Sequence, residues 1–115
     1  MPIAIEELDG GVTRVSLSGR IDIPGAQEID MPMSVVAGSR RAVVIDLSKV
    51  DFMASMGLRS LVVCAKSIMS KRGKVVLLSP QPMVEEVITI SGINDLIPIY
   101  HDEAAAVAAV QPAAA

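Results

Sequence analysis

The sequence predicts an α/β domain in which three to four helices pack on a mixed sheet of four to five strands. Two short runs of apolar, largely β-branched residues, 42–47 and 75–78, lie on either side of one amphipathic stretch. This is the pattern of two buried parallel strands joined by a helix. An alternating segment at the N-terminus adds an antiparallel hairpin to the same sheet.

The N-terminal hairpin is predicted from two alternating segments around a turn. Ile3 and Ile5 alternate with Ala4 and Glu6, which indicates a first strand. An Asp-Gly-Gly turn at 9–11 supplies residues that adopt positive φ readily. Apolar and polar residues alternate again over 13–18, so a second strand is expected, antiparallel to the first.

The segment from Arg20 to Arg41 is predicted to hold a helix. Asp22 is a suitable cap, and Pro24 is tolerated in a first helical turn. Pro32 lies in the middle of the apolar pattern and is expected to break or kink the helix. After the buried strand at 42–47, residues 48–53 are interpreted as a connection ending in two apolar plugs, Phe52 and Met53.

A second helix is predicted over about 56–71. Its apolar residues recur at helical spacing and form one stripe: Leu58, Leu61, Val62, Ala65, Ile68 and Met69. Lys71 and Arg72 suit the negative end of the helix dipole, and Gly73 is a natural cap beyond it. Cys64 lies on or beside this stripe, so we expect a buried packing residue.

The C-terminal third repeats the alternation of strand and helix. After the strand at 75–78, a helix is expected to start at Pro80 and Pro82 and to end at Gly92. Residues 96–99 are predicted to form an edge strand, because Pro98 lacks a ladder donor.

Asp102 is expected to cap a helix over about 103–110, and the residues from Gln111 onward are expected to fray. The chain is thus interpreted as one domain over 1–115, ordered over about 3–110.

Composition excludes several classes of function. The 115 residues carry 10 basic and 13 acidic side chains, and aromatic residues make up only 2%. An acidic chain without aromatic platforms is a poor binder of nucleic acid. One cysteine and one histidine argue against a disulfide framework and a metal site. No apolar run approaches the ~18 residues of a membrane span, so we expect a cytoplasmic protein without membrane insertion. We also expect no cofactor.

Ser55 is the most informative candidate for a functional residue, because it falls at the start of the longest predicted helix. Exposed N–H groups at such a position attract anions, and Gly57 leaves room for another molecule near the backbone. A plain helix cap is the more common role for a serine there.

An enzyme is not expected. The sequence has no Gly-x-Ser-x-Gly elbow and no phosphate loop, and His101 is its only imidazole. Asp46, at a predicted strand end, suits a catalytic cleft or the satisfaction of nearby backbone N–H groups. The acidic pairs at 6–7 and 85–86 are interpreted as solvated faces.

The order of motifs resembles the STAS domain family of anti-sigma-factor antagonists. Asp-Leu-Ser at 46–48 is followed by the apolar plug, a small residue, Ser55, and a Gly-Leu pair at 57–58 that opens a helix. Gly-Arg-Ile-Asp at 19–22 resembles the segment that precedes the family's first helix. The stretches 74–78 and 91–93 resemble its later strand and the end of its later helix, so the resemblance covers about residues 3–110.

The resemblance implies a regulatory switch. In the family, the serine before this helix is phosphorylated by a partner serine kinase that is also an anti-sigma factor, and a serine phosphatase restores the unmodified form. The matching acceptor here is Ser55. The resemblance also implies that the partner is contacted by Asp22, Ala54, Ser55, Met56, Gly57 and Leu58.

Two positions depart from the family's usual motif. Ala54 stands where the family often has Asp, and Met56 stands where it often has a second Ser or Thr. Met56 offers a flexible apolar contact, which favours protein binding. These departures leave open a phosphorylation-independent STAS subunit of a transporter or sensor complex. A second alternative is a domain that binds a nucleotide or small ligand. The oligomeric state is also left open.

Overall fold

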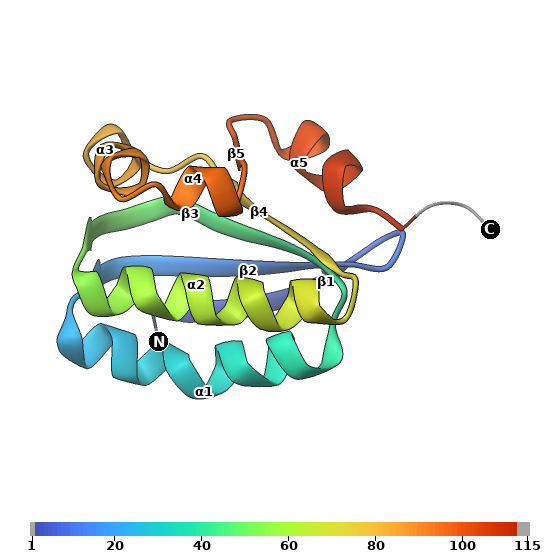
Figure 1. Ribbon diagram of the computed structural model, residues 1–115, viewed down its shortest axis with the longest axis horizontal. Coiled ribbons are helices and arrows are strands. Elements are labelled where there is room, and N and C mark those ends of the chain that lie inside the picture. Colours follow the sequence, from blue (N-terminus) through green and yellow to red (C-terminus); the bar gives the residue numbers. More distant parts are fainter. Residues whose placement is uncertain (1, 113–115) are drawn as a thin grey trace.

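The computed structural model describes residues 2–112, which form one mixed sheet with helices on both of its faces (Figure 1). The sheet has the strand order β1-β2-β3-β4-β5; β1 and β2 are antiparallel, and the remaining neighbours are parallel. The strands are β1 (Ile3–Leu8), β2 (Val12–Ile21), β3 (Ala42–Met53), β4 (Lys74–Leu78) and β5 (Ile99–Tyr100). The helices are α1 (Ile23–Ser39), α2 (Ser55–Ser70), α3 (Pro82–Ile90), α4 (Ile93–Leu96) and α5 (Glu103–Val110).

The predicted hairpin and the predicted parallel pair are confirmed. Gly10 and Gly11 both have positive φ, at 80° and 79°, and they connect β1 to β2. β3 and β4 are adjacent and parallel, and α2 connects them, as the two buried runs indicated. The sheet therefore places the carboxyl ends of β2, β3 and β4 at one edge, where α1, α2 and α3 begin.

The expected connection over 48–53 is wrong, because β3 continues as a strand to Met53. Its pairing with β2 shifts register twice, and each time β3 carries one extra residue. At the first shift the Asp46 carboxylate accepts a hydrogen bond from the Ser48 backbone N–H at 2.9 Å. These bulges interrupt the alternation of buried and exposed residues. Met53 is buried, whereas Phe52 is 39% exposed and is not an apolar plug.

The expected break at Pro32 is absent, because α1 runs through this residue as one helix of 17 residues. Ile29 and Met33, on either side of the proline, are both buried in the core. Packing of these neighbours holds both turns in place and offsets the missing N–H donor.

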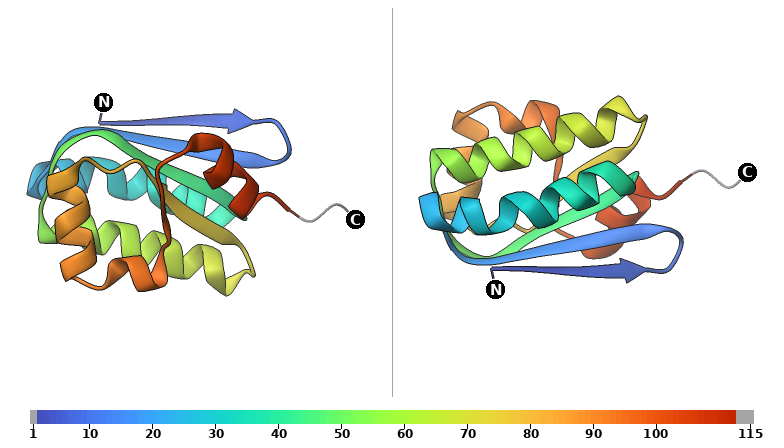
Figure 2. Two further views of the ribbon diagram at one scale, coloured as in Figure 1. Left: turned by 90° about the horizontal axis from the view of Figure 1, so that it is seen from above. Right: turned by 90° about the horizontal axis from the view of Figure 1, so that it is seen from below.

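The two faces of the sheet carry separate apolar cores (Figure 2). α1 and α2 cover one face, and their buried residues join those of α3 and α4 in the larger core. α5 covers part of the other face through Ala106 and Val110, which pack on Val12, Val44 and Val76 of the sheet.

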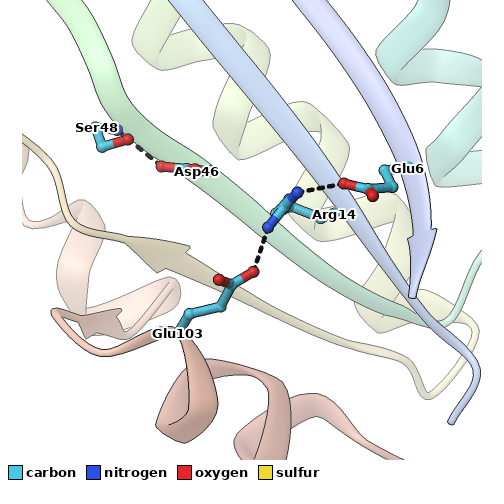
Figure 3. A network of polar contacts seen from close by, with 5 residues as sticks. All are labelled: Glu6, Arg14, Asp46, Ser48 and Glu103. Carbon is cyan, nitrogen blue, oxygen red and sulfur yellow. Dashed lines mark hydrogen bonds and ion pairs between the residues drawn. The ribbon is translucent and has the colours of Figure 1, made fainter. Parts of the chain in front are cut away.

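Arg14 fastens α5 to the sheet from the middle of β2. Its guanidinium donates to Glu6 on β1 and to Glu103 at the start of α5 (Figure 3). The hydrogen bond to Glu103 is the largest influence that raises the pKa of Arg14. The contact joins α5 to the N-terminal hairpin of β1 and β2, from which α5 is far separated in the sequence.

The turn after α2 differs from expectation in its cap. Arg72, not Gly73, adopts the left-handed conformation, with φ of 64°. A Cβ at Gly73 would lie 2.6 Å from the Arg41 carbonyl oxygen, so glycine is needed there for close approach and not for its φ.

The C-terminal elements are only partly as predicted. α3 starts at Pro82, and the Asp102 side chain caps α5 by accepting from the Ala105 N–H at 2.9 Å. The predicted last edge strand is present, but its bounds are wrong: α4 ends at Leu96, and β5 contains only Ile99 and Tyr100. The described residues hold five helices instead of three to four, because α4 forms after Gly92. Of the residues expected to fray, 113–115 lie outside the described range.

Candidate functional site

The candidate site lies at the edge of the sheet where α1 and α2 begin side by side (Figure 1). The Ala54 backbone N–H donates to the Ile21 carbonyl at 2.9 Å and so links the end of β2 to the start of α2. Only Ala54 separates β3 from α2. The loops that carry Asp22 and Ser55 are therefore held together by backbone pairing.

Asp22 is the N-cap of α1. Its Oδ1 accepts from the Gly25 N–H at 3.0 Å, and its Oδ2 lies 3.7 Å from Nε of Arg20. The guanidinium of Arg20 also lies over the Phe52 ring, at 4.3 Å from its centroid. The carboxylate of Asp22 therefore has a structural role that the sequence predicted, while the Arg20–Phe52 pair was not anticipated.

Ser55 is exposed and is the first residue of α2. The N-cap is Ala54, whose side chain makes no capping hydrogen bond. Ser55 is therefore not the helix cap that its residue type suggested. The N–H groups of the first turn lack a side-chain acceptor from the cap position, and they carry the partial positive charge that stabilises an anion.

The other residues that the motif assigned to this site divide into two sets. Met56 is 38% exposed and Ala54 is half-buried, so both can be reached from outside. Gly57 and Leu58 are buried. A Cβ on Gly57 would lie 2.4 Å from Sδ of Met53, so the space at this glycine is filled by the chain itself. The expectation that Gly57 admits another molecule is wrong.

A groove of about 380 Å³ runs between α1 and α2 from Met56 onward. Inside it the Ser60 hydroxyl donates to Oδ1 of Asp30 at 2.6 Å and ties the two helices together. This pair was not predicted, although a serine in the otherwise apolar face of α2 was a signal that its hydroxyl needed a partner. Cys64 also lines the groove but is buried, as predicted, and burial raises the pKa of its thiol to about 11.

Other chemistries find little support in residues 2–112. No three His, Cys, Asp or Glu side chains in this stretch gather closely enough to hold a metal ion. The Nε2 of His101 lies 2.7 Å from the Glu85 carboxylate, so the imidazole is engaged at α3. Of the helices between residues 2 and 112, none has both the length and the apolar character needed to cross a membrane.

Comparison with known proteins identifies the family. The STAS domain family matches residues 4–106. A Bordetella bronchiseptica protein provisionally named the anti-sigma factor antagonist BtrV is 31% identical over 114 residues, covering 98% of this chain and 97% of its own. An anti-sigma F factor antagonist of Paenibacillus polymyxa is 30% identical over 95 residues, or 81% of each chain.

A solved structure agrees with these sequence matches. The crystal structure of an anti-sigma factor antagonist from Mycobacterium paratuberculosis aligns with a TM-score of 0.85 and 32% identity, covering 96% of this chain and 93% of the other. Sequence and fold lead to one assignment: this chain belongs to the STAS domain family.

Proposed function

We propose that this protein is an anti-sigma-factor antagonist that binds a serine-kinase-type anti-sigma factor and is switched by phosphorylation of Ser55. The observation that carries the proposal is an exposed hydroxyl on the first residue of α2, at a position where it does not cap the helix. With the cap position taken by Ala54, the Ser55 side chain is available for modification. The named relatives are consistent with this role.

The site explains how a phosphoryl group can act without unfolding the domain. A phosphoserine carries about −1.5 to −2 charges at neutral pH. The free N–H groups at the start of α2 stabilise that charge within the isolated domain. In a complex, the same charge is placed among contacts made by Met56 and loses its solvation, so binding is lost. A serine phosphatase then restores the binding form.

The direct test is incubation with the candidate kinase-type anti-sigma factor and ATP, followed by mass-spectrometric mapping of the modified residue. We expect one phosphoryl group, on Ser55. Ser55→Ala removes the acceptor and keeps partner binding. Because Ser55 is not the cap, this variant is expected to change the unfolding free energy by no more than about 0.5 kcal/mol.

Binding measurements complete the test. Ser55→Asp is expected to weaken partner binding, while Ser70→Asp serves as the matched control because it adds the same charge at the exposed far end of α2. Modification of another residue, or equally tight binding by Ser55→Asp, contradicts the switch and favours the phosphorylation-independent subunit.

The residue before the acceptor allows a second test. Ala54→Asp supplies the missing cap and is expected to raise the unfolding free energy by about 1 kcal/mol. If the kinase recognises an acidic residue there, Ala54→Asp also raises the phosphorylation rate. Ala54→Asn, which caps without charge, then leaves the rate unchanged and separates recognition from capping.

A further inference from the structure

Two helices present exposed faces with side chains at helical spacing; the first face begins at Met56, within the site described above, and the second lies outside that site. The first, which we call the α2 stripe, consists of Met56, Arg59, Val63 and Lys66. These residues are spaced by three and four positions and therefore lie on one face of α2. All four are exposed, with Val63 at 58%. The stripe alternates apolar and positively charged side chains.

The second face, which we call the α3 stripe, consists of Met83, Glu86, Val87 and Ile90. Met83 and Ile90 are each 77% exposed, and Val87 is 38% exposed. The opposite side of α3 is buried in the larger core, so this helix is apolar on both sides. A contiguous exposed apolar face of this kind marks an interaction surface.

The two stripes complement each other. Both present large aliphatic side chains at helical spacing, and the cations of the α2 stripe match the carboxylate of Glu86 in the α3 stripe. Every residue of both stripes is exposed, so each stripe can be reached by another molecule. In the view of Figure 1, α2 lies between α1 and the sheet, and α3 lies at the upper left of the molecule.

We propose that the α2 stripe of one copy docks on the α3 stripe of a second copy. The contact joins two different surfaces and is therefore head-to-tail, which leaves one free stripe at each end of every assembly. Further copies add in the same way. Because each stripe is short, the contact is small, and association is weak and concentration-dependent.

Sedimentation velocity of the purified protein over a wide concentration range tests the proposal. We expect the weight-average mass to rise continuously with concentration, without a plateau at the dimer, and to fall with added salt. A protein that stays monomeric up to about 1 mM, or one that stops at a dimer, overturns the head-to-tail contact.

Complementation between two variants provides the sharper measurement. Val63→Glu disables the α2 stripe and Ile90→Lys disables the α3 stripe, so each variant alone is expected to associate at least tenfold more weakly. An equimolar mixture retains one intact contact and is expected to form a one-to-one dimer that grows no further. Val35→Lys, at a 61% exposed position on α1, is the matched control and leaves association unchanged. Failure of the mixture to dimerise, or loss of association in the control, overturns the proposal.

Discussion

Replacing Gly57 by alanine places a methyl group where α2 crosses the ends of β2 and β3. The new Cβ would lie 2.4 Å from Sδ of Met53, 2.7 Å from Cγ2 of Ile21 and 3.1 Å from the Ile21 carbonyl oxygen. The flexible Met53 side chain can move. Ile21 cannot move easily, because it is fully buried and its carbonyl accepts the Ala54 N–H.

The sign of the effect follows from two opposing contributions. Alanine is favoured over glycine in a helix by about 0.5–1 kcal/mol. Inserting a methyl group into a filled space costs about 1–3 kcal/mol. We therefore expect Gly57→Ala to lower the unfolding free energy by about 1–2 kcal/mol. Gly38→Ala is the matched control, since no atom lies within 4 Å of a Cβ on this exposed helical residue, and this variant is expected to gain stability.

Urea denaturation followed by circular dichroism measures both variants. The midpoint should fall for Gly57→Ala and rise for Gly38→Ala, with the slope unchanged in each case. If the two variants shift the midpoint in the same direction by similar amounts, the close approach of α2 to Ile21 does not limit this position and the reasoning is refuted.

Three further predictions concern other parts of the molecule. Burial raises the pKa of the Cys64 thiol from 9.0 to about 11, so folding favours the protonated thiol. Urea titrations at several pH values should therefore show that the unfolding free energy falls between about pH 9 and 11, and that it falls less in Cys64→Ala. Arg14→Met removes the contacts of Arg14 with Glu6 and Glu103, so amide hydrogen exchange over residues 103–110 should become about tenfold faster, while residues 55–70 keep their protection. Uniform acceleration of exchange in both segments would contradict a local role of Arg14. Pro32→Ala restores a backbone donor inside α1 and should raise the unfolding free energy by about 1–2 kcal/mol, whereas a decrease would mean that packing of the ring outweighs the lost hydrogen bond.

Local periodicity was sufficient for the central part of the fold. The runs at 42–47 and 75–78 and the stripe on α2 have single, regular periods, and their pairing followed from them. The prediction failed over 48–53, because two bulges break the alternation of buried and exposed residues in β3. The buried residues Val50 and Met53 are three positions apart, a spacing that is not typical of a strand. At Pro32 a correct local rule was outweighed by burial of Ile29 and Met33, which only the folded structure reveals.

The site was predictable to a similar degree. The motif placed Ser55 at the start of a helix, and the structure has it there. Sequence alone indicates that Gly57 has no side chain but not which atoms fill the space, so the expectation of room for another molecule at Gly57 was wrong. The Ser60–Asp30 contact joins residues 30 positions apart on two helices, and no local pattern predicts such a pair.

Ala54 is the only residue between β3 and α2, and this short connection has a consequence for the rate at which a partner associates with the site. Because Ile21 pairs with Met53 and the Ala54 N–H is bound to the Ile21 carbonyl, the backbone that carries Ser55 has little conformational freedom to lose. A partner that docks there need not order a loop, so the entropic cost of association falls mainly on side chains such as Met56. Encounters that meet the right orientation can then proceed without a slow rearrangement, and the lifetime of the complex depends on the contacts themselves.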